Sequence, residues 1–332
     1  MKETLDFIVI GAQKAGTTSL FEYLKRHPEL SVPPGKEVPY FSHDEEYGSS
    51  WEAYMRKAAL IDPARRWGTV TPHYMFGAVF DAADRAVRNA TYDVHTVPLR
   101  IRERLPDVRL IAILRDPTER ARSHHQMTFM NRLERRPFDE AIDAMLDPES
   151  LEQSRRYPEE KTSYVTRGEY GRILTGYFEI FPREQILVVF TEELERDPTS
   201  LLQRIYGFLG VAPDIVPDNL GTRYRTGATE RRLAWMSPYS SLSPQGLQRA
   251  AEQNLATRNL WQALPLGNRQ KIRRRYEDLA YRLDLWNQRE KPGASAPSPA
   301  PSTILRLREH FANDSEVLRA LVGECPPWQA SS

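Results

Sequence analysis

Residues 7–20 read FIVIGAQKAGTTSL, and this stretch decides the fold. Its short apolar run with β-branched side chains predicts a buried strand that ends at Gly11. After a loop of small residues, Leu20, Phe21 and Leu24 recur at helical spacing and predict a helix. A strand, a glycine-bounded loop and a helix start form an anion cradle, because unpaired backbone N–H groups and the positive end of the helix dipole point at one place. We therefore expect a phosphate-like group to bind there.

The residues of the loop indicate which phosphate compound fits. A nucleotide triphosphatase loop carries Lys directly after its second Gly, where it reaches the β- and γ-phosphates. Here Thr17 follows Gly16, and the lysine is Lys14, inside the loop. Lys14 is better placed against a group attached to a terminal 5′-phosphate, which the hydroxyls of Thr17 and Thr18 can bind without a metal. The alternative is a tight turn with an incidental surface lysine.

Composition limits the partners that the chain can recognise. It has 332 residues with 46 basic and 45 acidic side chains, a net charge of +1, which gives no overall field for nucleic acid or an anionic membrane. The single Cys325 excludes an intramolecular disulfide and suits a reducing compartment. No apolar run approaches a membrane span, and the first strand begins by Phe7, so we expect no signal peptide, no integral membrane segment and a cytosolic location.

A second chemical feature lies soon after the first helix. Prolines and a glycine in residues 32–41 exclude a regular element and place Lys36 and Glu37 on a constrained loop. A carboxylate near a phosphate site is unfavourable unless it has a task, and a general base is the obvious one. The alternative is a solvated Lys-Glu pair.

Residues 109–119 predict a second junction between a strand and a helix. Asp116 suits the N-cap position and Glu119 would complete a capping box. Arg115 ends the strand, where open α/β sheets bind ligands, and Ser123 follows about two helical turns later. Together they could hold a second phosphate. The alternative is a salt-bridged Arg and a helix-surface Ser, and His124 and His125 are interpreted as helix-surface or packing residues.

Periodicity and breakers predict the remaining elements. The predicted helices are 51–60, 81–96, 97–104, 167–181, 197–211 and 305–322, and the predicted strands are 67–71, ended by Pro72, and 185–190. Residues 234–287 also have a helical pattern, whereas residues 291–302 are Pro-rich and of low complexity.

Three segments together resemble the sulfotransferases that use 3′-phosphoadenosine 5′-phosphosulfate (PAPS). The similarity is greatest to the branch with the heparan sulfate N- and 3-O-sulfotransferase domains and their bacterial relatives. The segments are Gln13–Thr18, Lys36–Phe41 and Leu114–Ser123. The resemblance implies an α/β, P-loop-like three-layer fold with a central parallel sheet flanked by helices and a helical C-terminal region. It also implies one domain over 1–332, comprising a PAPS-binding core (5–225), a helical insertion or lid (230–290), a Pro-rich tether (291–302) and a C-terminal helix (303–328).

The resemblance also implies roles for individual residues. Lys14 would neutralise the leaving phosphate, Glu37 would deprotonate the acceptor, and Arg115 with Ser123 would hold the 3′-phosphate. The 5′-phosphate would be held by the loop residues Gln13, Lys14, Ala15, Gly16, Thr17 and Thr18. Catalysis would rest on positioning and charge neutralisation, with no metal required by these residues.

The chain departs from the family pattern at two places. Val70 stands where heparan-type enzymes have a lysine near the sulfuryl group, and His73 close by is a second candidate base after Glu37. The loop that closes over the cofactor lacks the disulfide of Golgi members and carries four arginines, of which we choose Arg225. The alternative is a solvated basic loop.

The predicted function is sulfuryl transfer from PAPS to a hydroxyl or amine of a glycan, glycolipid or secondary metabolite, releasing 3′-phosphoadenosine 5′-phosphate (PAP). The alternatives are a non-catalytic PAP- or nucleotide-binding protein and a nucleotide-dependent kinase of the P-loop class. The acceptor is the expected partner, with no nucleic acid, and the C-terminal helical region could form a homodimer.

Overall fold

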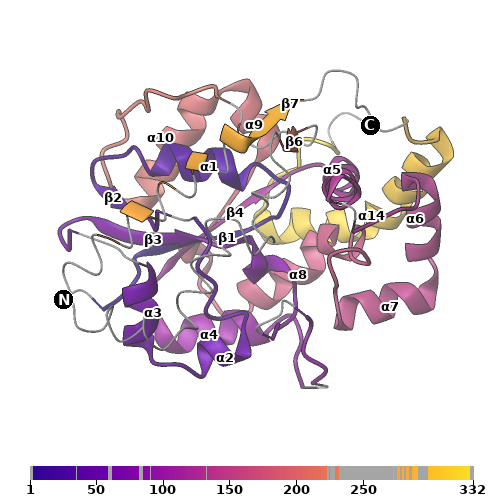
Figure 1. Cartoon of the computed structure of the whole chain (residues 1–332), viewed down its shortest axis with the longest axis horizontal. Coiled ribbons are helices and arrows are strands. Elements are labelled where there is room, and N and C mark those ends of the chain that lie inside the picture. The colour runs from indigo at the N-terminus through magenta and orange to yellow at the C-terminus, as the bar shows by residue number, and fades with distance from the viewer. Residues whose placement is uncertain are drawn as a thin grey trace.

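The fold is seen in a computed structural model (Figure 1). It describes residues 3–222 except 35, 59–61, 82–84, 90 and 132, then 224, 229–231, 272, 275–276, 279, 282–283, 286–290 and 298–329. The strands are β1 (Phe7–Gly11), β2 (Leu30–Ser31), β3 (Arg66–Val70), β4 (Arg109–Leu114), β5 (Ile186–Phe190), β6 (Thr229–Arg231) and β7 (Gln288–Glu290). The α-helices are α1 (Thr17–Leu24), α2 (Asp44–Tyr47), α3 (Trp51–Ala58), α4 (Thr96–Arg104), α5 (Pro117–Met130), α6 (Phe138–Met145), α7 (Pro148–Arg156), α8 (Tyr170–Phe178), α9 (Thr191–Arg196), α10 (Pro198–Leu209) and α14 (Pro301–Val322). Short 3-10 helices are η1 (Pro72–Met75), η2 (Thr166–Gly168) and η3 (Arg183–Gln185).

The centre of the molecule is a five-stranded sheet in the order β2-β3-β1-β4-β5, in which every pairing is parallel. Alternate residues of β1 face opposite sides of this sheet. Phe7 and Val9 belong to one buried cluster with residues of α1 and α10, whereas Ile8 and Ile10 belong to another with residues of α3, α4 and α8. Figure 1 shows these helices on the two sides of the sheet. Because β1 is central and buried on both faces, the loop at its carboxyl end is held in the middle of the sheet edge.

The C-terminal helix α14 is joined to α8 by charged groups. The carboxylate of Asp314 accepts hydrogen bonds of 2.8 Å from the backbone N–H groups of both Gly171 and Arg172, in the first turn of α8. Glu169, directly before α8, accepts from Arg172 at 2.7 Å and from His310 of α14 at 3.0 Å. The buried Glu169 side chain therefore links helices that are far apart in the sequence.

Most predicted elements are confirmed, and the predicted helix over 81–96 is wrong. The described residues there form turns and isolated bridges, such as that between Phe80 and Ala86, before α4 begins at Thr96. The carboxylate of Asp81 accepts from the backbone N–H of Arg85 at 3.0 Å, so a local side-chain bond competes with the helix. The C-terminal helix begins at Pro301, one turn earlier than the predicted 305.

The N-cap at Asp116 is confirmed, but the capping box is wrong. The Asp116 side chain accepts from the backbone N–H groups of Thr118 and Glu119. The backbone N–H of Asp116 donates to the Glu192 carboxylate at 3.0 Å, and the Glu119 carboxylate accepts instead from Arg122 at 2.8 Å. A carboxylate from α9 thus takes the place that the local pattern assigned to Glu119.

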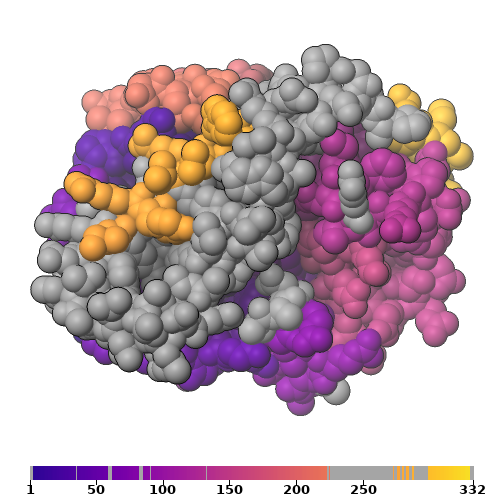
Figure 2. Space-filling view, in the orientation of Figure 1, coloured from indigo at the N-terminus to yellow at the C-terminus, as the bar shows by residue number. Residues whose placement is uncertain are grey.

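Figure 2 shows which helices form the described parts of one face of the molecule. The surface of α5 to α7 forms the right side, α10 the upper left edge, and α14 the far right edge.

Candidate active site

The loop between β1 and α1 has the form of an anion cradle. Lys14 and Gly16 both have left-handed backbone conformations, with φ of 69° and 88°. Helix α1 begins after Gly16 with no side-chain cap and no acidic residue in its first turn. No side chain therefore caps the N–H groups of that turn, and these groups and the helix dipole favour an anion at this position.

Two bonds from neighbouring elements fix the loop in place. The Ala12 N–H donates to the carbonyl of Ile113 in β4 at 2.7 Å, and the Thr191 hydroxyl of α9 donates to the Ala15 carbonyl at 2.8 Å. Residues from β4 and α9 thus hold both sides of the turn that presents Lys14.

The side chain of the loop residue Gln13 bonds to residues from much later in the chain. Its amide nitrogen donates to Glu160 Oε1 at 2.8 Å, and its amide oxygen accepts from Arg167 Nη1 at 2.8 Å. Both polar atoms of the side chain are thus engaged with protein groups. Sequence reasoning missed Glu160 and Arg167, because the two lie more than a hundred positions beyond the loop and no local pattern connects them to it.

The second segment brings Glu37 to the cradle. Lys36 Nζ lies 2.6 Å from Glu37 Oε1 and 3.4 Å from Thr17 Oγ1. The Lys36 side chain is only 5% exposed, whereas that of Glu37 is 34% exposed. The ammonium therefore lies between the loop and the carboxylate, whose charge it neutralises. Sequence reasoning noted Lys36 only as the neighbour of Glu37.

The third predicted catalytic residue, His73, lies on the far side of Glu37. Its Nδ1 is 3.6 Å from Glu37 Oε2, and it belongs to η1 rather than to the end of the preceding strand. Val70, which stands in the place of the family's lysine, is fully buried in the apolar core. The structure thus brings Thr17, Lys36, Glu37 and His73 together in one line of contacts.

The predicted 3′-phosphate residues lie at the next strand. Arg115 follows the last residue of β4, and Ser123 lies half-buried two turns into α5. The Arg115 guanidinium is 28% exposed and pairs with Glu119 at 3.6 Å. A phosphate at this position would have to compete with Glu119 for the guanidinium.

The predicted closing residue, Arg225, lies outside the described residues. Its neighbour Tyr224 is described, and the Tyr224 N–H donates to the Ser19 hydroxyl of α1 at 3.2 Å. Two residues earlier, the Thr222 carbonyl accepts from the Tyr23 hydroxyl at 2.9 Å. The chain before Arg225 is therefore attached to the helix that begins at the cradle.

The two histidines of α5 lie in the interior, and not on the helix surface, which was the other reading of the sequence. His124 and His125 are both buried. Burial lowers the pKa of His124 to about 3, so its imidazole is neutral at physiological pH.

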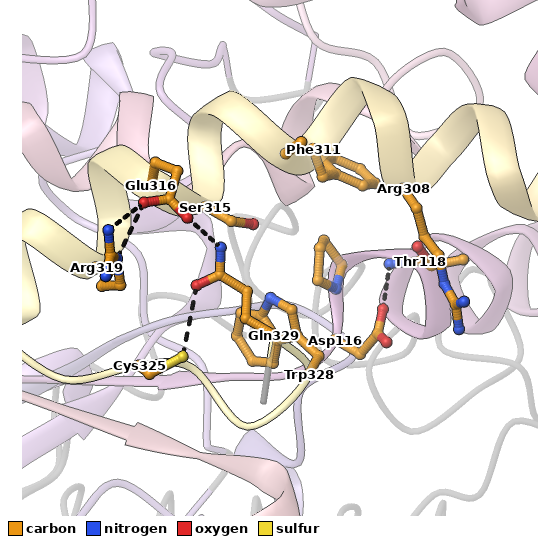
Figure 3. Close-up of a pocket in the computed structure, with 12 residues that line it drawn as sticks. Asp116, Thr118, Arg308, Phe311, Ser315, Glu316, Arg319, Cys325, Trp328 and Gln329 are labelled. Carbon is orange, nitrogen blue, oxygen red and sulfur yellow. Dashed lines mark hydrogen bonds and ion pairs between the residues drawn. The ribbon is translucent and has the colours of Figure 1, made fainter. Parts of the chain in front are cut away.

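A separate cavity of about 400 Å³ lies between α14 and the N-terminus of α5 (Figure 3). Phe311 and Trp328 provide aromatic surface, and Arg308 and Arg319 provide charge. In Figure 3 the residues of α14 face Asp116 across this space. Its lining includes none of the predicted catalytic residues, so it is distinct from the candidate active site.

A family described as "Sulfotransferase domain" matches residues 4–225, which include all three site segments. The chain belongs to the sulfotransferase family. Heparan sulfate glucosamine 3-O-sulfotransferase 5 of Homo sapiens is 28% identical over 214 residues, 64% of this chain and 55% of that protein. Bifunctional heparan sulfate N-deacetylase/N-sulfotransferase 3 of Homo sapiens is 29% identical over 218 residues, 62% of this chain and 22% of that protein. This sulfotransferase chain thus spans about half the length, or less, of these curated relatives.

A sulfotransferase from Alicyclobacillus acidocaldarius has the same fold. Its structure covers 96% of both chains with a TM-score of 0.60 at 22% identity. The family and the P-loop-like α/β fold inferred from sequence are confirmed. Among the described residues of this sulfotransferase, no helix is long and apolar enough to span a membrane.

Proposed function

We propose that this sulfotransferase domain transfers a sulfuryl group from PAPS to a hydroxyl or amine of an acceptor. The observation that carries the proposal is the contact line from Thr17 through Lys36 to Glu37, with distances of 3.4 Å and 2.6 Å. One buried ammonium joins the anion cradle to a partly exposed carboxylate. This combination suits transfer to a nucleophile, because it places a base beside the bound donor.

The cradle fits the 5′-phosphate of PAPS because the start of α1 is uncapped and lacks acidic side chains. When bound, PAPS supplies the sulfuryl group, and PAP remains after transfer. Lys14 and Lys36 neutralise the charge that develops on the departing phosphate. Arg115 and Ser123 hold the 3′-phosphate, and Arg225 closes the site. These side chains supply the positive charge, so the proposal requires no metal.

Glu37 is the general base in this proposal. Its Oε1 is held by Lys36, and its Oε2 lies 3.6 Å from His73 Nδ1. The carboxylate is therefore held at one oxygen by the ammonium and faces the imidazole at the other, while about a third of the side chain is open to an approaching acceptor. Glu37 takes the proton of the acceptor as it attacks, and His73 orients the carboxylate.

The acceptor is proposed to be a glycan, with a glycolipid or a secondary metabolite as the other classes to test. The names of the two human relatives refer to heparan sulfate, one to glucosamine 3-O-sulfation and the other to N-sulfation. Both a hydroxyl and an amine of an amino sugar are therefore reasonable first targets. A cytosolic location and a homodimer through the C-terminal helical region are further proposals, which fractionation and light scattering would test.

Transfer of labelled sulfuryl from PAPS to a panel of these acceptors tests the proposal. We expect labelled product with the wild type in the presence of EDTA. Glu37→Gln should bind PAP normally and form no product. Tight PAP binding without product from any acceptor class would instead favour the non-catalytic binding protein.

A further inference from the structure

A polar cluster lies beside the cofactor loop and has no role in the proposed chemistry. Its centre is Glu160, between α7 and η2. Glu160 Oε1 accepts from Gln13 Nε2 at 2.8 Å and lies 3.1 Å from His124 Nε2, while Oε2 accepts from Arg167 Nη1 at 2.6 Å. Three elements distant in the sequence thus meet at one carboxylate.

Glu160 is charged in this cluster, and His124 is neutral. Burial raises the pKa of Glu160, but Arg167 and His124 outweigh burial and bring this pKa well below its ordinary value. His124 Nδ1 faces Arg120 Nη1 at 3.4 Å. Because the guanidinium can only donate, His124 accepts at Nδ1 and carries its proton at Nε2, where it donates to Glu160.

Arg167 links the loop to the segment that carries His73. Its side chain is 3% exposed, and its Nη1 donates to the amide oxygen of Gln13 at 2.8 Å. Its guanidinium lies 3.6 Å from the centre of the Phe76 ring. Phe76 directly follows η1, the short helix that contains His73. The Arg167 guanidinium therefore contacts both Gln13, in the loop proposed to bind PAPS, and Phe76, next to the short helix that carries His73.

The loop needs such support because of its backbone conformation. Lys14 has φ of 69°, which is unfavourable for a residue with a Cβ atom and persists only where the surroundings hold it. Gln13, the residue before it, has both amide atoms bonded to the Glu160–Arg167 pair. These bonds fix the loop directly beside its strained residue.

We propose that Glu160 and Arg167 are positioning residues, which act through Gln13 to hold the cofactor loop in the conformation that binds the 5′-phosphate of PAPS. Gln13 then contributes by placing the loop and not by contacting the cofactor through its amide. The inference rests on the proposed function, because it names how the same site is held ready for its donor.

The test measures PAP binding by calorimetry for the wild type, Glu160→Gln, Gln13→Leu and the double variant. Glu160→Gln removes the charge that holds Gln13, and Gln13→Leu removes the amide that is held. We expect PAP binding about tenfold weaker in each single variant. If Glu160 acts through Gln13, the double variant binds PAP about as well as either single variant. Glu169→Gln is the control, because it removes the carboxylate of a second arginine-paired glutamate, one that is buried and lies outside the site. This control should lower the unfolding temperature and leave PAP affinity unchanged.

Two results would overturn the inference while the wild type still binds PAP. One is unchanged PAP affinity in Glu160→Gln, and the other is a double variant whose loss is the product of the single losses. Should Glu160→Gln fail to fold, Gln13→Leu decides alone, because it leaves the Glu160–Arg167 ion pair intact. Unchanged affinity in that variant refutes the positioning role. A wild type that does not bind PAP is a different outcome, which refutes the proposed function itself.

Discussion

Replacement of Lys36 by Met tests whether a second lysine serves the donor site. Met has nearly the length and apolar character of the Lys36 stem, which is buried, so the substitution removes the charge and little else. Lys36 Nζ lies 3.4 Å from Thr17 Oγ1, the hydroxyl that we expect to bind the 5′-phosphate. We therefore expect weaker binding of PAP.

The size of this effect follows from the geometry. A phosphate oxygen bonded to the Thr17 hydroxyl would lie ~5 Å from the Lys36 ammonium, given a hydrogen bond of about 2.7 Å. Two unit charges at ~5 Å attract by ~3 kcal/mol at an effective dielectric constant of ~20. Glu37, at 2.6 Å from the same ammonium, offsets part of this attraction. A net loss of ~1.4 kcal/mol corresponds to about tenfold weaker binding.

Calorimetric titration with PAP measures the change, and Lys57→Met provides the control. Lys57 pairs with Glu46 at the same distance of 2.6 Å, but both side chains are more than a third exposed and lie on α3 and α2. This control should bind PAP as the wild type does. PAP affinity in Lys36→Met within about twofold of the wild type would refute the argument, because a charge so close to the phosphate cannot be silent.

Three further predictions concern other groups. His73→Gln should lower the rate of sulfuryl transfer less than Glu37→Gln does, because His73 only orients the base. Equal losses of rate in the two variants would contradict this assignment. Glu119→Gln should tighten PAP binding several-fold, because it releases the Arg115 guanidinium from its carboxylate partner. Titration with PAP at low salt measures this change, and an unchanged affinity would show that Arg115 does not bind phosphate. Burial raises the pKa of Glu169, but hydrogen bonds from His310 and Arg155 outweigh burial and bring it to about 2. Glu169 then adds ~3 kcal/mol to the free energy of unfolding above pH ~4.5, which is lost as the pH falls towards ~2. Denaturation should therefore show Glu169→Gln to be less stable than the wild type by this amount at pH 7 and equally stable at pH 2. A variant as stable as the wild type at both pH values would contradict the prediction.

The sequence was sufficient for the parts of the site that local patterns encode. The loop before Thr17 and the junction at Arg115 follow from strand, breaker and capping signals within a few residues of each other. The error over residues 81–96 arose where side chains such as Asp81 bond to the nearby backbone, because such bonds compete with a helix that periodicity alone favours.

Contacts between distant segments could not be predicted in this way. Lys36 and Thr17 meet only because the sheet brings two loops to one edge. The bonds of Gln13 to Glu160 depend on the packing of helices much later in the chain. For the same reason, Glu192 rather than Glu119 bonds to the Asp116 N–H.

The most direct test of the central claim is a calorimetric titration with PAP in EDTA, compared with ATP and magnesium. Lys14→Ala and Arg115→Ala, which remove one cation at each proposed phosphate, are titrated alongside. The account predicts tight PAP binding without metal, clearly weaker binding in both variants, and little binding of ATP. No binding of PAP, or a preference for ATP with magnesium, would contradict the claim that the cradle holds the donor of a sulfuryl transfer.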